Sequence, residues 1–363
     1  MFECLNKLGE LLEKEKPPND YGHQLLRDHM YRIRGILAGK NPPPYELEIQ
    51  TTGACNLNCS HCFGRYYKRI GHSMTLDELT LIASRVADFK EDGYQIDTIK
   101  FCGTTGEPLV NPVTLDGIRI FKCMDRKVIL YTNGLLLGKM HDDLHYYDIV
   151  AKADKVNISL DADSEETFLK IKGRSGFNKI ISNIEHLVNV RTDNHKIVTS
   201  YVVNKHNYTG ILPFARNLRS IGVDEIWYRV DFTDLKSIKA LSKEISTDLK
   251  KAVELSTEKC SIVSVYSEDD IKGEDDAFNS YGKKCYNQCF WACVGPNCEL
   301  YACGHRTHGG VKSFGSLLDH SFKEVWNSKK RLKSLSKLPD KHCRFCSPSS
   351  RWRNIYMNFF SKL

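Results

Sequence analysis

Three cysteines stand close together in the first third of the sequence, in the run Cys55-x3-Cys59-x2-Cys62. Thiolates are the soft ligands that iron–sulfur clusters require. Because a 4Fe–4S cluster has four irons, three cysteines would hold it and leave one iron open to another ligand. A structural zinc site would instead need four ligands, and His61 and His72 stand at a poor spacing for that role.

Glycines and polar residues follow several predicted strands. Gly106, Glu107 and Pro108 follow residues 96–102, Asn133 follows 128–132, Ser159 and Asp161 end 156–160, and Asn204 follows 197–203. Glycines at a strand end let a ligand approach the backbone, and polar groups at the carboxyl ends of parallel strands are where ligands bind. Each of these residues, taken alone, is equally explained as a turn or a loop cap.

The cysteine run and these polar groups together resemble the signature of the radical S-adenosylmethionine (SAM) superfamily. The resemblance implies that the three cysteines hold a 4Fe–4S cluster and that Glu107 meets the amino group of SAM. Thr105 stands where the family usually has a glycine, and His61 where it usually has an aromatic residue. The other SAM-binding residues that the resemblance implies are Gly106, Pro108, Asn133, Ser159, Asp161 and Asn204.

A second group of cysteines lies near a predicted β-hairpin in the C-terminal part. The hairpin turns at residues 295–297, and a predicted helix over 322–335 follows it. The cysteines that could converge there as four ligands are Cys285, Cys303, Cys343 and Cys346. On this segment alone, a four-cysteine zinc ribbon is as good an interpretation as an iron–sulfur cluster.

This second group resembles the twitch domain, a shortened SPASM domain of radical SAM enzymes that carry an auxiliary cluster. The spacing fits the SPASM pattern if Cys298 replaces its glycine. The resemblance therefore implies one auxiliary 4Fe–4S cluster. Cys289, Cys293 and Cys298 remain unassigned as surplus thiols, and one of them is an alternative to Cys285 as a ligand.

The elements that must position these residues alternate between strands and helices. Short runs rich in Ile, Val and aromatic residues predict buried strands. They span residues 45–51, 96–102, 128–132, 156–160, 197–203 and 225–230. Apolar residues at helical spacing predict helices over 76–89, 177–187 and 208–218, with Thr75 as an N-cap and Gly222 past the last helix.

Strands separated by helices predict an α/β fold with a parallel sheet, and six units predict a partial (β/α)6 barrel. Three regions are expected: a helical N-terminal extension over 1–44, the partial barrel over 45–265, and a small hairpin-and-helix domain over 280–350 that binds the auxiliary cluster. Residues 267–276 are acidic and contain glycine, which is typical of a linker.

Composition limits the class of protein. A hydrophobic fraction of 41% in 363 residues supports a substantial core, and a net charge of +7 is too mild for a typical nucleic-acid binder. The sequence has no apolar run of membrane-spanning length and does not begin like a signal peptide, so we expect a cytoplasmic protein without a membrane partner. In such a chain, metal ligation explains fourteen cysteines better than disulfides.

The resemblance implies reductive cleavage of SAM to a 5′-deoxyadenosyl radical, with flavodoxin or ferredoxin as an electron donor. We expect oxidation of a small hydroxylated substrate, with an electron passing to the auxiliary cluster. The residues that could face the substrate are Tyr228, Arg229, Asp231, His305 and Arg306. The alternatives are a radical SAM maturase or epimerase acting on a peptide or sugar, and a non-catalytic zinc-binding scaffold.

Overall fold

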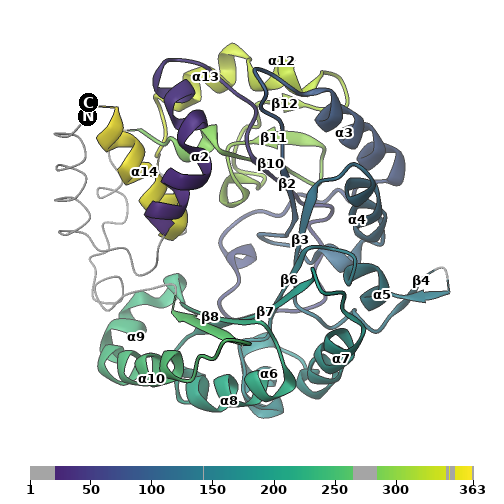
Figure 1. The fold of residues 1–363 in the computed structure, drawn as a ribbon. Coiled ribbons are helices and arrows are strands. Elements are labelled where there is room, and N and C mark those ends of the chain that lie inside the picture. Colours follow the sequence, from purple (N-terminus) through teal and green to yellow (C-terminus); the bar gives the residue numbers. More distant parts are fainter. Residues whose placement is uncertain (1–20, 142, 265–283, 341–342, 344–347, 362–363) are drawn as a thin grey trace.

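The computed structural model describes residues 21–141, 143–264, 284–340, 343 and 348–361. Within this part of the chain, a curved ten-stranded sheet forms an open ring with helices around its outside (Figure 1). Its strand order is β12-β11-β10-β1-β2-β3-β6-β7-β8-β9. The strands from β1 to β9 in this order are parallel to one another, so the α/β partial barrel predicted from the sequence is confirmed.

The six predicted strands are all present, and a seventh parallel strand follows them. Their bounds are β1 (Glu46–Ile49), β2 (Thr98–Phe101), β3 (Lys127–Thr132), β6 (Lys155–Ser159), β7 (Lys196–Val203), β8 (Glu225–Val230) and β9 (Ser261–Ser264). A separate two-stranded hairpin joins β4 (Met140–His141) and β5 (Leu144–His145).

Side chains of the barrel strands alternate between two environments. In β1, Leu47 and Ile49 are fully buried in the hydrophobic core, whereas Glu46 and Glu48 line a central cavity. In β2, Ile99 is likewise buried in the hydrophobic core and Lys100 lines the cavity. Because successive side chains of a strand point to opposite faces, apolar residues face the helices and polar residues face the inside.

The outer helices follow the amphipathic patterns of the sequence. They are α3 (Leu76–Asp88), α4 (Val113–Cys123), α5 (Tyr146–Val150), α6 (Glu165–Lys172), α7 (Phe177–Val190), α8 (Ile211–Ile221), α9 (Leu235–Ala240) and α10 (Ser242–Glu254). Thr75 begins α3 with a capping box that includes Glu78, as its side chain predicts. Gly222 ends α8 in the left-handed conformation, with a φ of 98°.

The C-terminal part continues the barrel sheet. Strand β10 (Trp291–Val294) pairs in parallel with β1 and turns back as β11 (Glu299–Tyr301), which pairs with β12 (Gly315–Ser316). The single helix expected over 322–335 is two helices, α12 (Phe322–Trp326) and α13 (Lys329–Leu335). They separate because the side chain of Ser328 caps a new helix by accepting from the Arg331 N–H.

Two terminal helices lie side by side near the open side of the ring (Figure 1). They are α2 (Tyr21–Leu37) and α14 (Pro348–Phe360). A small apolar cluster holds Ile33 of α2 and Tyr356 of α14 against Phe290. The linker expected over 267–276 lies outside the described residues.

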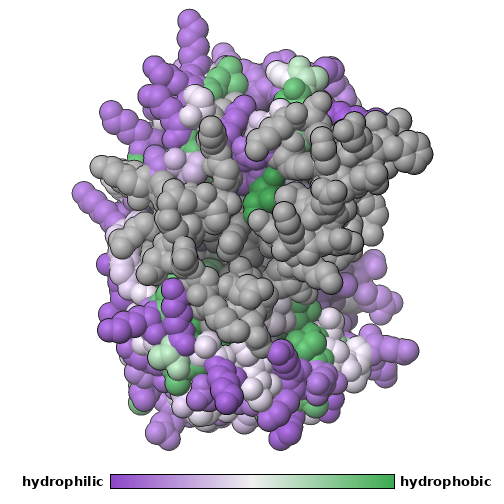
Figure 2. Space-filling model, turned by 90° about the vertical axis from the view of Figure 1, so that its left-hand side faces the viewer, coloured by the Kyte–Doolittle hydropathy of each residue, from purple (hydrophilic) through white to green (hydrophobic). Residues whose placement is uncertain are grey.

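The surface in Figure 2 is mostly hydrophilic where its residues are described, with separate small hydrophobic areas. No helix in the described part of the chain has the length and apolar character needed to cross a membrane.

Candidate functional site

A cavity of about 990 Å³ occupies the interior of the barrel. It extends from Lys127 and Lys155, the first residues of β3 and β6, to the loops beyond the carboxyl ends of the strands. The cavity wall includes almost all of the barrel site residues predicted from the sequence. These are Cys55, Cys59, Cys62, Gly106, Glu107, Pro108, Asn133, Ser159, Asp161, Arg229 and Asp231, together with His305 from the C-terminal part.

The loop that carries the three cysteines is held by the end of α6. The N–H groups of Asn58 and Ser60 donate to the carbonyls of Lys172 and Ile171, at 3.1 and 2.8 Å. Arg174 donates to the carbonyl of Asn56 at 3.0 Å. Hydrogen bonds from the end of α6 and from Arg174 thus fix the course of the loop.

Sulfur atoms of this loop already accept backbone hydrogen bonds. The Leu57 N–H donates to Cys55 Sγ at 3.4 Å, and the Gly64 N–H donates to Cys62 Sγ at 3.2 Å. Burial raises the pKa of Cys59 to about 11, while the positive charge of Lys172 opposes this rise. Donors and a nearby cation stabilise thiolates, so the loop fits an anionic metal centre.

The three loop sulfurs do not all lie as close together as the ligands of a single zinc ion. Zn–S bonds of about 2.3 Å in a tetrahedral site would bring sulfur atoms to roughly 3.8 Å from one another. Across the described residues, the only three potential ligand atoms within 4.8 Å of one another belong to His72, Glu78 and Cys298. His61, between the cysteines, also has a buried Nδ1 with no hydrogen-bond partner in the described part of the chain, which a bound ligand could satisfy.

The turn before Glu107 requires both of its glycines. A Cβ on Gly106 would lie 2.2 Å from the carbonyl oxygen of Thr52, and a Cβ on Gly103 would lie 2.4 Å from the oxygen of Gly106. The turn therefore packs directly against the chain that leads to the first cysteine, and the Glu107 N–H donates to the Ala54 carbonyl at 2.8 Å.

Glu107 is buried and accepts three hydrogen bonds. The donors are the Leu109 N–H at 3.1 Å, the Thr132 hydroxyl at 2.6 Å and the Asn133 N–H at 2.7 Å. Burial raises the pKa of Glu107, and these hydrogen bonds oppose the rise. A carboxylate has about four acceptor positions, so it retains capacity for one further donor from the cavity.

Asn133 links this carboxylate to the cysteine loop. Its backbone N–H donates to Glu107, and its side-chain Nδ2 donates to Asn56 Oδ1 at 2.7 Å. Its Oδ1 accepts from the Leu135 N–H, which closes the turn after β3. Asn133 can therefore close this turn and also take part in a ligand-binding site.

Lys172 is a residue of the site that the sequence reasoning missed. Its ammonium is buried and forms an ion pair with Asp161, and it also donates to the Ser159 carbonyl at 3.1 Å. His61 Nε2 lies 3.4 Å from the same carboxylate. Burial alone would raise the pKa of Asp161, but Lys172 and His61 hold it well below its usual range. A lysine at the end of an amphipathic helix gives no sequence signal of this role.

Asn204 lies in a local turn of the backbone. Its Oδ1 accepts from the His206 N–H at 2.8 Å, and its N–H donates to Asn207 Oδ1 at 2.7 Å. It is not among the described residues that line the cavity. Its predicted place near the adenine of SAM stays a prediction.

The side chains of β8 divide between the cavity and the core. Arg229 and Trp227 line the cavity, with the guanidinium 5.5 Å from the centre of the indole ring. Tyr228 instead donates to the Ile211 carbonyl in the core, so the expectation that it faces a substrate is wrong. Its place follows from strand alternation, because it lies between two inward-facing residues.

Two other predicted substrate residues and one unpredicted residue lie on the cavity wall. Asp231 accepts from the Thr233 N–H and hydroxyl, at 2.8 and 2.6 Å. His305 contacts Phe63, which follows the last cysteine of the loop, with ring centres 5.2 Å apart. Trp291, which the sequence reasoning missed, has a buried indole N–H with no partner among the described residues.

Three of the four predicted auxiliary cysteines lie in one neighbourhood. Burial, together with the charges of Cys343 and Cys285, raises the pKa of Cys303 to about 12. Burial also raises the pKa of Cys285 to about 11, with Cys343 as the next cause. Cys346 lies outside the described residues, so its role as the fourth ligand stays a prediction.

Hydrogen-bond donors surround these sulfurs. The Asp340 N–H and Arg306 Nη1 donate to Cys343 Sγ at 3.4 and 3.6 Å, and Asn354 Nδ2 lies 3.7 Å from Cys285 Sγ. Arg306 also forms an ion pair with Asp340. This donor set, with a cation beside soft thiols, fits a buried anionic metal centre.

The surplus cysteines have different surroundings. Cys289 is buried in the apolar cluster with Phe290 and Tyr356, which favours Cys285 over Cys289 as the ligand. Cys293 is buried in β10, with its sulfur 3.8 Å from Glu48. Cys298 occupies the hairpin turn with a φ of 59°, in the left-handed region that glycine favours. This is the backbone conformation expected of a glycine, and its replacement of the glycine in the SPASM pattern stays a prediction.

The partial α/β barrel thus places the three cysteines and a buried glutamate on one inner wall. Residues 49–218 match the family model described as the radical SAM superfamily.

The curated relatives cover part of the chain. A protein of Saccharolobus islandicus named "Probable GTP 3′,8-cyclase" is 31% identical over 185 residues, which are 51% of this chain and 56% of that protein. A protein of Methanocella arvoryzae with the same name is 30% identical over 173 residues, 47% of this chain and 52% of that protein. The chain thus spans about half the length of the curated relatives that it matches.

Solved structures resemble more of the chain. SuiB of Streptococcus suis, bound to the precursor peptide SuiA, has a TM-score of 0.62 at 14% identity, covering 89% of this chain and 74% of that one. The protein anSMEcpe, with bound AdoMet and a peptide, has a TM-score of 0.54 at 15% identity, covering 88% and 96%. At these identities the likeness establishes the fold, including antiparallel C-terminal strands beside the barrel.

Proposed function

We propose that this protein is a radical SAM oxidoreductase that oxidises a small hydroxylated substrate and carries an auxiliary 4Fe–4S cluster. The observation that carries the proposal is one cavity of about 990 Å³ whose wall includes the three loop cysteines, Glu107 and the polar residues of β8. Ligand pockets commonly have volumes of roughly 300–1,000 Å³, so this one has room for SAM and a second molecule together.

Residues of this chain would bind and orient SAM beside the cysteine loop. Glu107 retains acceptor capacity for an ammonium group, and a buried carboxylate forms a strong charge-assisted hydrogen bond with such a group. Asn133 would hold the cysteine loop and Glu107 in a fixed position relative to each other. When bound, the cluster and SAM supply an electron and a carbon radical that abstracts hydrogen from the substrate.

The substrate would lie against β8 and β10. Arg229 offers hydrogen-bond donors, and Trp291 offers a buried indole N–H that has no partner among the described residues. Asp231 offers a carboxylate that could accept the proton lost on oxidation of an alcohol. When bound, the auxiliary cluster supplies an electron acceptor, which suits a net oxidation.

A peptide substrate is the second candidate. The solved structures of SuiB and anSMEcpe with bound peptides favour it, because both share the fold of this chain. The curated relatives are named as probable GTP 3′,8-cyclases, which adds a nucleoside triphosphate to the substrates worth testing. The auxiliary cysteines are common to the first two candidates and do not separate them.

The first experiment is anaerobic reconstitution of the full chain, followed by incubation with SAM and dithionite. The proposal predicts 5′-deoxyadenosine, and a Cys55→Ala/Cys59→Ala/Cys62→Ala variant should form none while it retains iron at the auxiliary site. Alcohols, a panel of peptides and GTP, all labelled with deuterium, would then be compared by the deuterium that each transfers to 5′-deoxyadenosine. A triple variant that still forms 5′-deoxyadenosine would overturn the proposal.

A further inference from the structure

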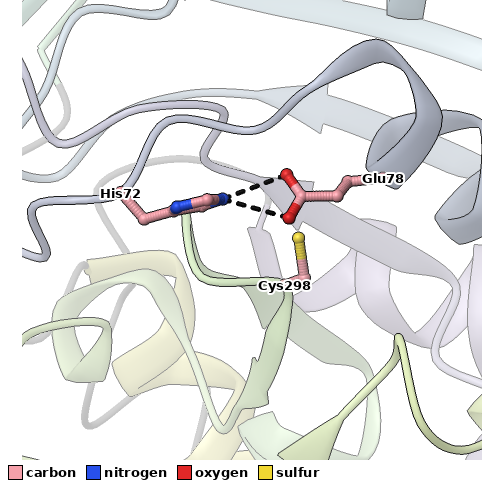
Figure 3. A group of neighbouring side chains, drawn as sticks. All are labelled: His72, Glu78 and Cys298. Atoms are coloured by element: carbon pink, nitrogen blue, oxygen red, sulfur yellow. Dashed lines mark hydrogen bonds and ion pairs between the residues drawn. The ribbon is translucent and has the colours of Figure 1, made fainter.

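Three potential metal ligands from separate parts of the chain meet outside the barrel cavity. His72 precedes α3, Glu78 lies in its first turn, and Cys298 lies in the turn between β10 and β11 (Figure 3). Their ligand atoms all lie within 4.8 Å of one another. Neither group of cluster cysteines includes any of the three.

The distances between these atoms are close to those of a metal site. His72 Nε2 lies 3.2 Å from Glu78 Oε1 and 3.0 Å from Oε2. Tetrahedral zinc with bonds of roughly 2.0–2.1 Å to nitrogen and oxygen separates these ligands by about 3.3 Å. Glu78 Oε2 also accepts the helix-capping N–H of Thr75 at 2.8 Å, whereas the contact of Oε1 is with His72, its proposed partner in the site.

The backbone aims the sulfur of Cys298 at this pair. The residue has a φ of 59°, a backbone conformation that residues other than glycine rarely adopt. Its N–H donates to the Gly295 carbonyl and its carbonyl accepts from the Leu317 N–H, both at 2.9 Å. Glycine would be the favoured residue in such a turn, so the side chain that replaces it needs another explanation.

We propose that His72, Glu78 and Cys298 form a zinc site that joins the barrel to the C-terminal hairpin. A nitrogen, an oxygen and a sulfur ligand suit zinc, which is borderline in softness and accepts all three. The side chain of His72 is 44% exposed, so water can reach the site and complete a tetrahedron as the fourth ligand.

The site would close the base of the cysteine loop. Thr52 and Ser73 form an antiparallel bridge at this base, and their hydroxyls are 2.6 Å apart. His72 is next to that bridge, while Cys298 lies in the hairpin turn before β11, the strand that leads to Cys303. Zinc would therefore fix the start and end of the loop relative to the hairpin, without contacting SAM or substrate.

The test measures bound metal on the full chain with both clusters reconstituted anaerobically. The protein is equilibrated with zinc and a competing chromophoric chelator, and zinc and iron are then counted. We expect about one zinc per chain in addition to the iron. Zinc-edge absorption spectroscopy should report one sulfur neighbour with nitrogen and oxygen neighbours, whereas zinc in a cluster position would have several sulfur neighbours.

Two variants and a control decide the outcome. Cys298→Gly removes the sulfur and suits the left-handed backbone, and His72→Gln changes an exposed side chain, so both should fold. Each should weaken zinc binding at least about tenfold with iron unchanged. Cys260→Ala, which removes a buried thiol elsewhere, should bind zinc like the parent. The proposal is overturned if the parent binds no zinc, if both variants bind as the parent does, or if zinc leaves only together with iron.

Discussion

Lys172 and Asp161 form a buried ion pair directly behind the loop that carries the cluster cysteines. Their side chains are 3% and 2% exposed. Asp161 also accepts from the Val202 N–H at 2.7 Å, and Lys172 ends α6, whose last carbonyls hold the loop. The pair thus connects the fourth and fifth barrel strands in sequence, β6 and β7, to the loop that would bind the first cluster.

Lys172→Met should destabilise the fold and alter the cluster. Removing one partner of a buried pair leaves an uncompensated charge, so the free energy of unfolding should fall by about 3–5 kcal/mol. The loss of a positive charge near Cys59 should also lower the midpoint potential of the cluster, because the more reduced state is more negative. Chemical denaturation and a redox titration measure the two effects.

A double variant, Lys172→Met/Asp161→Asn, is the matched control. With both charges gone, its unfolding free energy should recover part of the loss. If the single variant had the same free energy of unfolding as the parent, the ion pair would not contribute to the stability of the fold.

Local sequence patterns predicted the barrel because each of its strands and helices has a recognisable run of apolar residues or a typical end residue. Buried Ile and Val runs identified the strands, and Thr75 and Gly222 identified helix ends. Strand β9, of sequence SIVS, was missed because four residues with a serine at each end give almost no periodic signal. The break at Ser328 was missed because the apolar spacing continues across it.

The site was predictable where a motif carries its own spacing. The cysteine run and Glu107 fall on one cavity as expected. Lys172 and Trp291 were not predictable, since their roles depend on which residues the folded sheet brings near them. The αL conformation of Cys298 was not predicted, since a cysteine gives no local signal for that backbone region.

Glu107→Gln should weaken SAM binding strongly and the fold modestly. The amide would lose the charge that an ammonium needs, so the Kd for SAM should rise at least about tenfold. It would also turn an NH2 group toward donors such as the Asn133 N–H, which should cost about 1–3 kcal/mol of stability. Calorimetric titration with SAM and thermal unfolding separate the two effects.

Thr132→Val is the control for Glu107. It removes one hydrogen bond to the carboxylate and leaves its charge in place. Its effect on the Kd for SAM should be clearly smaller than that of Glu107→Gln. Equal effects would mean that Glu107 acts only through the geometry of the turn.

Cys303→Ala should abolish the role of the auxiliary cluster and leave that of the first cluster intact. It removes a proposed auxiliary ligand while the cysteine loop stays intact, so reductive cleavage of SAM should continue in the absence of substrate. Product should not form, because the oxidation lacks its electron acceptor. Iron content, 5′-deoxyadenosine and product are measured on the same samples, with Cys289→Ala as the thiol control. Full turnover without the auxiliary cluster would favour a redox-neutral reaction such as epimerisation.

His29 should make the packing of α2 sensitive to acid. Its ring lies 4.1 Å from that of Tyr45, centre to centre, and its pKa is lowered to about 4 by burial and by the charges of Arg353 and Arg32. Asp28 and Glu46 oppose this shift without reversing it.

The sign of the effect follows from the lowered pKa in the folded state. As pH falls below about 6.5, the unfolded chain binds the proton first, so stability present above that pH is progressively lost toward pH 4. His29→Phe keeps an aromatic ring and removes the proton site. The variant and the parent should therefore be similarly stable at pH 8, and the variant should gain about 2 kcal/mol over the parent by pH 5. Denaturant unfolding at both pH values measures this difference, and a constant difference would show that His29 does not titrate between them.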